Sequence, residues 1–195
     1  MNTDDTRTNP IGLQSIGFIF DLPPLSSSLP AQRTAESFTD DDAAIIARAL
    51  RILDARLRRG HAFGDRDSVK AYLRLQTQGL AHEVFGVMFL DTMHCLIAYE
   101  QLFRGTLAET SVHPREVLKR ALALNAASVV IHHNHPSGSC YPSEGDRAVT
   151  CALQAALSLV EVAVLDHVIT SDAEAVSMSE LGMLPSGVRP GALRS

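Results

Sequence analysis

The spacing of apolar residues predicts two helices in the first half of the chain. From Thr39 onward, apolar residues recur every three or four positions and form one face of an amphipathic helix: Ile46, Leu50, Leu53 and Leu57. Thr39 and Asp42 match a capping box that begins this helix. A shorter apolar stripe over Val69–Leu75 predicts a second helix, with Asp67 or Ser68 as its N-cap.

From Glu83 the pattern changes to that of strands. Val84–Leu90 and Cys95–Phe103 are nearly continuous apolar runs separated by a short polar turn, which predicts a hairpin in a well-buried sheet. Helices and strands then alternate: a helix from Pro114, a strand over 127–133, a helix from Ser143 to about Leu159 and a strand over 160–170. This order indicates an α/β fold with a mixed β-sheet flanked by helices.

Composition divides the chain into four segments. Residues 1–38 contain four of the nine prolines and a run of serines, which predicts a flexible tail. Residues 39–78 form the predicted N-terminal helical extension, and residues 79–184 hold the α/β domain. Residues 185–195 are expected to be a C-terminal tail.

The overall composition is that of a globular protein. The chain has 195 residues, 46% hydrophobic and 20% charged, with a net charge of −5, so it has no general positive field to attract nucleic acid. Its one basic cluster, Arg56, Arg58 and Arg59, lies where a helix C-terminus favours cations. Three cysteines favour a reducing compartment, and neither a signal peptide nor a membrane span is evident. We therefore expect a soluble, cytoplasmic protein.

The candidate chemistry lies between the strand over 127–133 and the helix that follows it. His133 and His135 are two residues apart at the strand end, so both side chains point to the same face. Ser143 is a natural N-cap, and Asp146 lies three residues later on the first helical turn. Two imidazoles and one carboxylate are a common ligand set for catalytic zinc, with a fourth position for water. The same spacing also arises without metal, from strand-end histidines and ordinary caps.

A resemblance to a known family favours the metal site. His133-x-His135, seven residues, then Ser143-x-x-Asp146 resembles the motif of the JAMM (MPN+, JAB-type) metalloproteases. Four further segments are similar to those of the bacterial RadC family: Phe103–Leu107, Pro114–Val117, His133–Gly138 and Leu165–Ile169. The resemblance covers roughly residues 65–184, and it identifies 79–184 as a RadC-like JAB/MPN zinc domain.

The resemblance implies a fold, a cofactor and an activity. In a JAB-type site, His133, His135 and Asp146 would bind Zn²⁺, and Ser143 would steady the oxyanion or the bound water. JAMM proteins cleave peptide and isopeptide bonds, so a protein or peptide substrate is expected. An upstream glutamate is the general base in that family. Glu83 precedes a glycine-containing apolar strand as the JAMM glutamate does, and we assign it that role.

Several alternatives remain open at this stage. Glu100 competes with Glu83 as base, because the predicted hairpin places residue 83 opposite about 102 and residue 100 opposite about 85, at the same end of the sheet. Cys140 lies in the loop between ligands and is a candidate for the open metal position, or is an idle loop residue. His167 is either a partner that orients a ligand or a core histidine.

The competing function is that of a RadC-type DNA repair or mobile-element accessory protein acting with nucleic acid. Full-length RadC relatives begin with a helix-hairpin-helix-like region, whereas residues 1–38 show no such pattern. This difference and the acidic net charge favour the hydrolase. The sequence names neither the substrate nor the oligomeric state.

Overall fold

The structure is a computed structural model that describes residues 39–59, 66–105 and 112–184. It contains four helices and five strands in these ranges: α1 Asp40–Arg59, α2 Arg66–Thr77, β1 Val84–Leu90, β2 Leu96–Arg104, α3 Pro114–Ala123, β3 Ser128–Asn134, α4 Glu144–Ser158, β4 Ala163–Thr170 and β5 Ala175–Ser177. The predicted tails, 1–38 and 185–195, lie outside the described residues.

The strands form one mixed sheet in the order β2-β1-β3-β4-β5. β1 pairs antiparallel with β2 on one side and with β3 on the other, β3 and β4 are parallel, and β5 returns antiparallel along β4. The predicted hairpin and the mixed α/β sheet are thus confirmed. The parallel pair requires the crossover that α4 supplies, and this crossover brings the start of α4 beside the end of β3.

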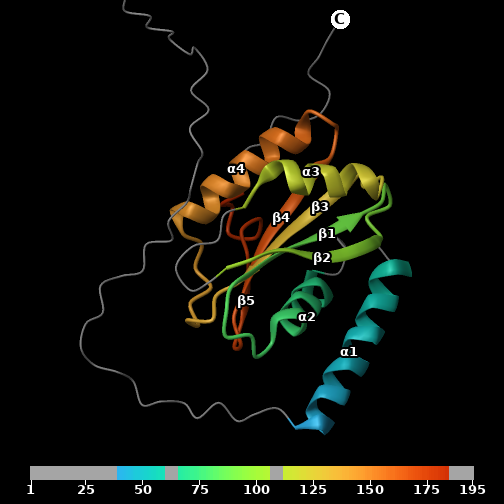
Figure 1. The fold of residues 1–195 in the computed structure, drawn as a ribbon, viewed down its shortest axis with the longest axis vertical. Coiled ribbons are helices and arrows are strands. Elements are labelled where there is room, and N and C mark those ends of the chain that lie inside the picture. Colours follow the sequence, from blue (N-terminus) through green and yellow to red (C-terminus); the bar gives the residue numbers. More distant parts are fainter. Residues whose placement is uncertain (1–38, 60–65, 106–111, 185–195) are drawn as a thin grey trace, which may run out of the picture.

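Helices cover both faces of the sheet (Figure 1). On one face, α3 and α4 pack on alternate strand residues such as Phe85, Val87 and Ile131. On the other face, α2 and part of α1 pack on the intervening residues, including Met88 and Val130. Because side chains alternate along a strand, His133 falls on the face covered by α3 and α4, and His132 falls on the opposite face.

The N-cap predicted from the sequence is confirmed for α1 but not for α2. Thr39 and Asp42 form the predicted capping box of α1, because the Asp42 N–H donates to the Thr39 hydroxyl at 3.2 Å and the Thr39 N–H donates back to the carboxylate at 2.9 Å. The N-cap predicted for α2 is wrong. The helix begins at Arg66, so Asp67 and Ser68 lie inside its first turn.

The basic cluster at the end of α1 has a structural partner in the sheet. Arg58 pairs with Asp54 one turn earlier, at 2.7 Å, and donates to the carbonyl of Ile97 on β2 at 2.5 Å. This guanidinium therefore holds α1 against the edge strand. For Arg58, the arrangement agrees with the predicted role at a helix C-terminus.

His132 belongs to a buried network on the face away from the candidate site. Its ring contacts the Tyr99 hydroxyl and the Thr170 hydroxyl, each at 2.9 Å, and burial lowers its pKa to about 3. Gly86 is required beneath Tyr99, since any Cβ at this position would collide with the phenol. His132 is therefore a packed core residue.

Candidate metal centre

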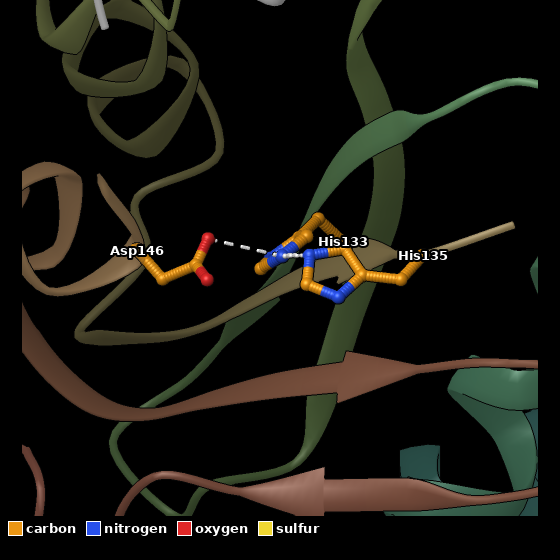
Figure 2. Close-up of side chains that lie close together, drawn as sticks. All are labelled: His133, His135 and Asp146. Atoms are coloured by element: carbon orange, nitrogen blue, oxygen red, sulfur yellow. Dashed lines mark hydrogen bonds and ion pairs between the residues drawn. The ribbon is translucent and has the colours of Figure 1, made fainter. Parts of the chain in front are cut away.

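The predicted ligands meet at the junction of β3 and α4. The Nε2 atoms of His133 and His135 lie 2.8 Å apart, and Oδ1 of Asp146 lies 3.1 Å from Nε2 of His133. One ligand atom from each residue falls within 4.8 Å of the others (Figure 2). His133 lies near the end of β3, His135 directly follows this strand, and the carboxylate comes from the first turn of the crossover helix.

The N-cap of α4 orients Asp146. The Ser143 hydroxyl and backbone N–H both donate to Oδ2 of Asp146, at 2.7 Å each, and the Asp146 N–H donates back to the hydroxyl at 3.2 Å. The cap therefore holds Oδ2 and directs Oδ1 at His133. It also means that the single hydroxyl proton of Ser143 points at the carboxylate.

Oδ1 of Asp146 is buried and has no hydrogen-bond donor among the described residues. It lies 3.1 Å from Nε2 of His133, and this contact lacks hydrogen-bond geometry. Burial alone raises the pKa of this carboxyl, but His133 and the hydrogen bond from Ser143 hold the pKa well below its ordinary range. A buried anionic oxygen without a donor is costly unless a cation or proton occupies the adjoining space.

The tautomer of His135 also suits a cation. Its Nδ1 lies 2.6 Å from the carbonyl of Ser139, which can only accept, so Nδ1 carries the proton. Nε2 then presents a lone pair to the cluster. Zn²⁺ bonds of about 2.0–2.2 Å span ligand atoms roughly 3.3 Å apart in a tetrahedron. The two separations from Nε2 of His133, 2.8 and 3.1 Å, are close to this span, and all three ligand atoms lie within 4.8 Å of one another. The residues present fit a divalent metal ion.

Glu83 lies beside this cluster. It lines one pocket together with His133 and Asp146, at a half-buried position just before β1. Because Phe85 pairs with His133, continuing the antiparallel register places Glu83 opposite His135. Burial raises the pKa of the Glu83 carboxyl; the charge of Asp146 raises it further, and His133 opposes this.

Asn134 fixes the backbone on both sides of Glu83. Its side-chain oxygen accepts from the Val84 N–H at 2.8 Å, and its amide nitrogen donates to the carbonyl of His82 at 3.1 Å. Asn134 therefore caps the segment that carries Glu83, a role that its position in the sequence does not indicate.

Glu100 lies elsewhere on the same face of the sheet. The register predicted for the hairpin is wrong by two to three residues, because irregularities in the β1–β2 pairing place Glu100 opposite Val87 and Gly105 beside Glu83. The Glu100 carboxylate pairs with Arg120 of α3, and this hydrogen bond keeps the pKa of Glu100 below its ordinary value. Glu100 does not line the pocket that Glu83, His133 and Asp146 share.

Two further candidates from the sequence can now be placed. His167 is fully buried, and its Nε2 lies 2.8 Å from Nδ1 of His133, so it contacts a candidate ligand directly. The Cys140 thiol is buried and donates to the carbonyl of Glu174 at 3.5 Å, and burial raises its pKa. Cys140 does not belong to the group of converging ligand atoms found among the described residues.

Comparison with known proteins identifies the family of this chain. A model described as the RadC-like JAB domain matches residues 63–183. The chain belongs to the RadC-like JAB domain family. The matched range of this RadC-like chain includes helix α2, the whole sheet and the His133, His135 and Asp146 cluster.

Several bacterial relatives are more than half identical to this RadC-like chain. A UPF0758 protein of Polaromonas sp. is 55% identical over 141 residues, which cover 72% of this chain and 63% of the relative. A UPF0758 protein of Methylibium petroleiphilum is 54% identical over 142 residues, 73% of this chain and 64% of the relative. The chain thus matches slightly less than two thirds of the length of these relatives.

Two other observations complete the description of this RadC-like chain. Within the described ranges, none of the helices has both the length and the apolar character needed to cross a bilayer. Sequence reasoning missed Thr150, whose hydroxyl lies 2.6 Å from Nδ1 of His167. Its position one helical turn after Asp146 was the available signal, because residues four apart share a helix face.

Proposed function

We propose that this chain is a zinc-dependent metallohydrolase of the JAMM type that cleaves an amide bond, in a peptide or an isopeptide, with water as the nucleophile. One observation carries the proposal: two imidazole nitrogens and a carboxylate oxygen without a hydrogen-bond donor converge in a pocket that a half-buried glutamate also lines. Membership of the RadC-like JAB family supports it.

The proposed cofactor follows from the ligand set. His133, His135 and Asp146 would hold Zn²⁺ and leave a position open for water or substrate. When bound, zinc supplies Lewis-acid chemistry, because it lowers the pKa of a coordinated water and polarises a carbonyl oxygen. The remaining steps fall to the side chains of the chain itself.

Glu83 is the proposed general base. Its raised pKa brings the carboxylate closer to the operating pH, where a group both accepts and returns a proton efficiently. It would take a proton from the attacking water and deliver it to the leaving nitrogen. The hold of Asn134 on the adjoining backbone limits the movement of this carboxylate during both transfers.

Ser143 has two proposed roles. Through its bonds to Oδ2 it orients Asp146, and its hydroxyl is also the candidate donor to the oxygen on which negative charge develops. The second role requires the hydroxyl to turn from the carboxylate toward the substrate. Because Oδ2 keeps the bond from the Ser143 N–H, at 2.7 Å, Asp146 retains one anchor during such a rotation.

Cleavage of a library of peptides and isopeptides by zinc-loaded protein tests the proposal, with His135→Ala and Glu83→Gln as matched inactive controls. The proposal predicts products from the wild type that both variants fail to form above background. Zinc-loaded wild type that cleaves no member, or cleaves equally well as Glu83→Gln, would contradict it. Cleavage of DNA or RNA by the same preparation would instead favour the nucleic-acid function.

A further inference from the structure

A continuous chain of hydrogen bonds joins the two elements that carry the candidate metal ligands. The Thr150 hydroxyl lies 2.5 Å from the carbonyl oxygen of Asp146 and 2.6 Å from Nδ1 of His167. Nε2 of His167 lies 2.8 Å from Nδ1 of His133. Thr150 and His167 have no exposed surface, and His133 is 5% exposed, so water does not complete these bonds.

The directions of these bonds follow from the group at one end. A backbone carbonyl can only accept, so the Thr150 hydroxyl donates its single proton to Asp146. The hydroxyl oxygen must then accept from Nδ1–H of His167. Two other acceptors are available to the Thr150 proton. If the proton went to Nδ1 of His167, the hydroxyl and carbonyl oxygens would lie 2.5 Å apart with no proton between them, which is unfavourable. The Met178 sulfur, at 3.9 Å, is a longer contact with a weaker acceptor.

The hydrogen-bond directions continue from His167 to the candidate ligand His133. The ring of His167 is fully buried, and its two hydrogen-bond partners are a hydroxyl and another imidazole, which favours the neutral form. A neutral ring protonated at Nδ1 carries a lone pair on Nε2, so Nδ1 of His133 must donate to it. A neutral His133 then has its own lone pair on Nε2, the atom that faces His135 and Asp146.

We propose that Thr150 and His167 are positioning residues that hold His133 in the tautomer able to bind a metal ion. The proposal rests on the metal site of the proposed function, but not on the reaction assigned to it. Without this chain of bonds, His133 could carry its proton on Nε2 and donate it to the lone pair of His135 at 2.8 Å. Neither of these two nitrogen atoms would then have a lone pair free for a metal ion. Partners that orient a ligand histidine typically change metal affinity about 10- to 100-fold when they are removed.

Two substitutions of Thr150 separate this role from simple packing. Thr150→Val keeps the shape and removes the hydroxyl, whereas Thr150→Ser keeps the hydroxyl and removes a methyl group. We expect the zinc dissociation constant, measured by competition with a chromogenic chelator, to rise about 10- to 100-fold in Thr150→Val and to stay within about threefold of wild type in Thr150→Ser. If Thr150 acted only through packing, the valine variant would bind as the wild type does, and the serine variant would be the weaker one.

A second readout measures the tautomer itself. Long-range ¹H–¹⁵N correlation spectra of metal-free protein, recorded where the imidazoles are neutral, identify which nitrogen of His133 is protonated. We expect protonation at Nδ1 in the wild type and in Thr150→Ser, and loss of that bias in Thr150→Val. Protonation at Nε2 in the wild type would overturn the proposal, even if the valine variant does not fold.

The two proposals fail in different ways. Zinc-loaded wild type that cleaves no amide would contradict the proposed function, while the affinities and the His133 tautomer would still decide the role of Thr150 and His167. Conversely, an active enzyme whose zinc affinity and His133 tautomer are unchanged in Thr150→Val would overturn the positioning role alone.

Discussion

Glu100 accepts two hydrogen bonds from the guanidinium of Arg120, at 2.7 and 2.5 Å, and this pair joins β2 to α3. The bond from Arg120 keeps the pKa of Glu100 low, whereas burial raises the pKa of Glu83 beside the candidate ligands. The two acids that sequence spacing left equivalent therefore have different surroundings and different proton affinities.

Replacing each glutamate by glutamine should affect turnover differently at positions 83 and 100. Glu83→Gln should retain the metal and the fold but lose turnover by on the order of a hundredfold or more, because the amide cannot accept a proton. Glu100→Gln should keep turnover within a few-fold of wild type. Zinc content and initial rates of both variants check this, and activity lost only in Glu100→Gln would transfer the role of base to Glu100.

The second prediction concerns stability and pH in the metal-free protein. The folded-state pKa of Glu83 is raised, so the wild type loses stability as the pH rises through the unfolded-state pKa toward the folded-state value. Glutamine has no such dependence. The free energy of unfolding of Glu83→Gln should therefore increase relative to wild type between about pH 4 and pH 7.5. Urea unfolding at both values measures the difference, and a constant difference would refute the raised pKa.

The third prediction uses the two capping boxes of the chain as a matched pair. Ser143 and Thr39 make the same bonds at the starts of α4 and α1, and only Ser143 anchors a candidate ligand. Each alanine variant should lose about 1 kcal/mol of stability. Ser143→Ala should also lose turnover by on the order of a hundredfold. The turnover of Thr39→Ala should equal that of the wild type. Equal turnover in both variants would reduce Ser143 to a cap.

The sequence predicted those parts of the site that depend on local spacing. The ligand pair at the end of β3 follows from the period of two along a strand, and the capping box of α4 follows from rules for helix ends. The hairpin follows from two apolar runs separated by a short polar turn. Other relationships depend on pairings between distant segments. Glu83 lies opposite His135 because of the register of β1 against β3. Thr150 contacts His167 only when the crossover helix packs on β4. β5 has three residues, too few for an apolar pattern to identify it.

The fourth prediction concerns the three free thiols, which differ in exposure. Cys140 is buried against Glu174, Cys95 is intermediate and Cys151 is exposed. Alkylation should therefore modify Cys151 first and Cys140 last. Mass spectrometry of the partially alkylated protein gives this order. Cys140→Ser should leave turnover at the wild-type level, and an increase would indicate instead that the Cys140 thiol occupies the open metal position.

The proposed function requires one metal ion held by His133, His135 and Asp146. Neutral imidazole is the ligand form, so binding should be strongest at mildly alkaline pH and weaken as the pH falls through the histidine range. The His135→Ala variant removes one ligand and leaves the Ser143 and Asp146 cap of α4 intact. It is therefore the control that separates a specific site from adventitious binding.

The most direct test is elemental analysis of purified protein, covering all first-row divalent metals, after equilibration with zinc at mildly alkaline pH and removal of excess ion. We predict about one zinc per chain in the wild type and a large loss in His135→Ala. Wild-type protein without bound zinc, or His135→Ala with full stoichiometry, would contradict this prediction.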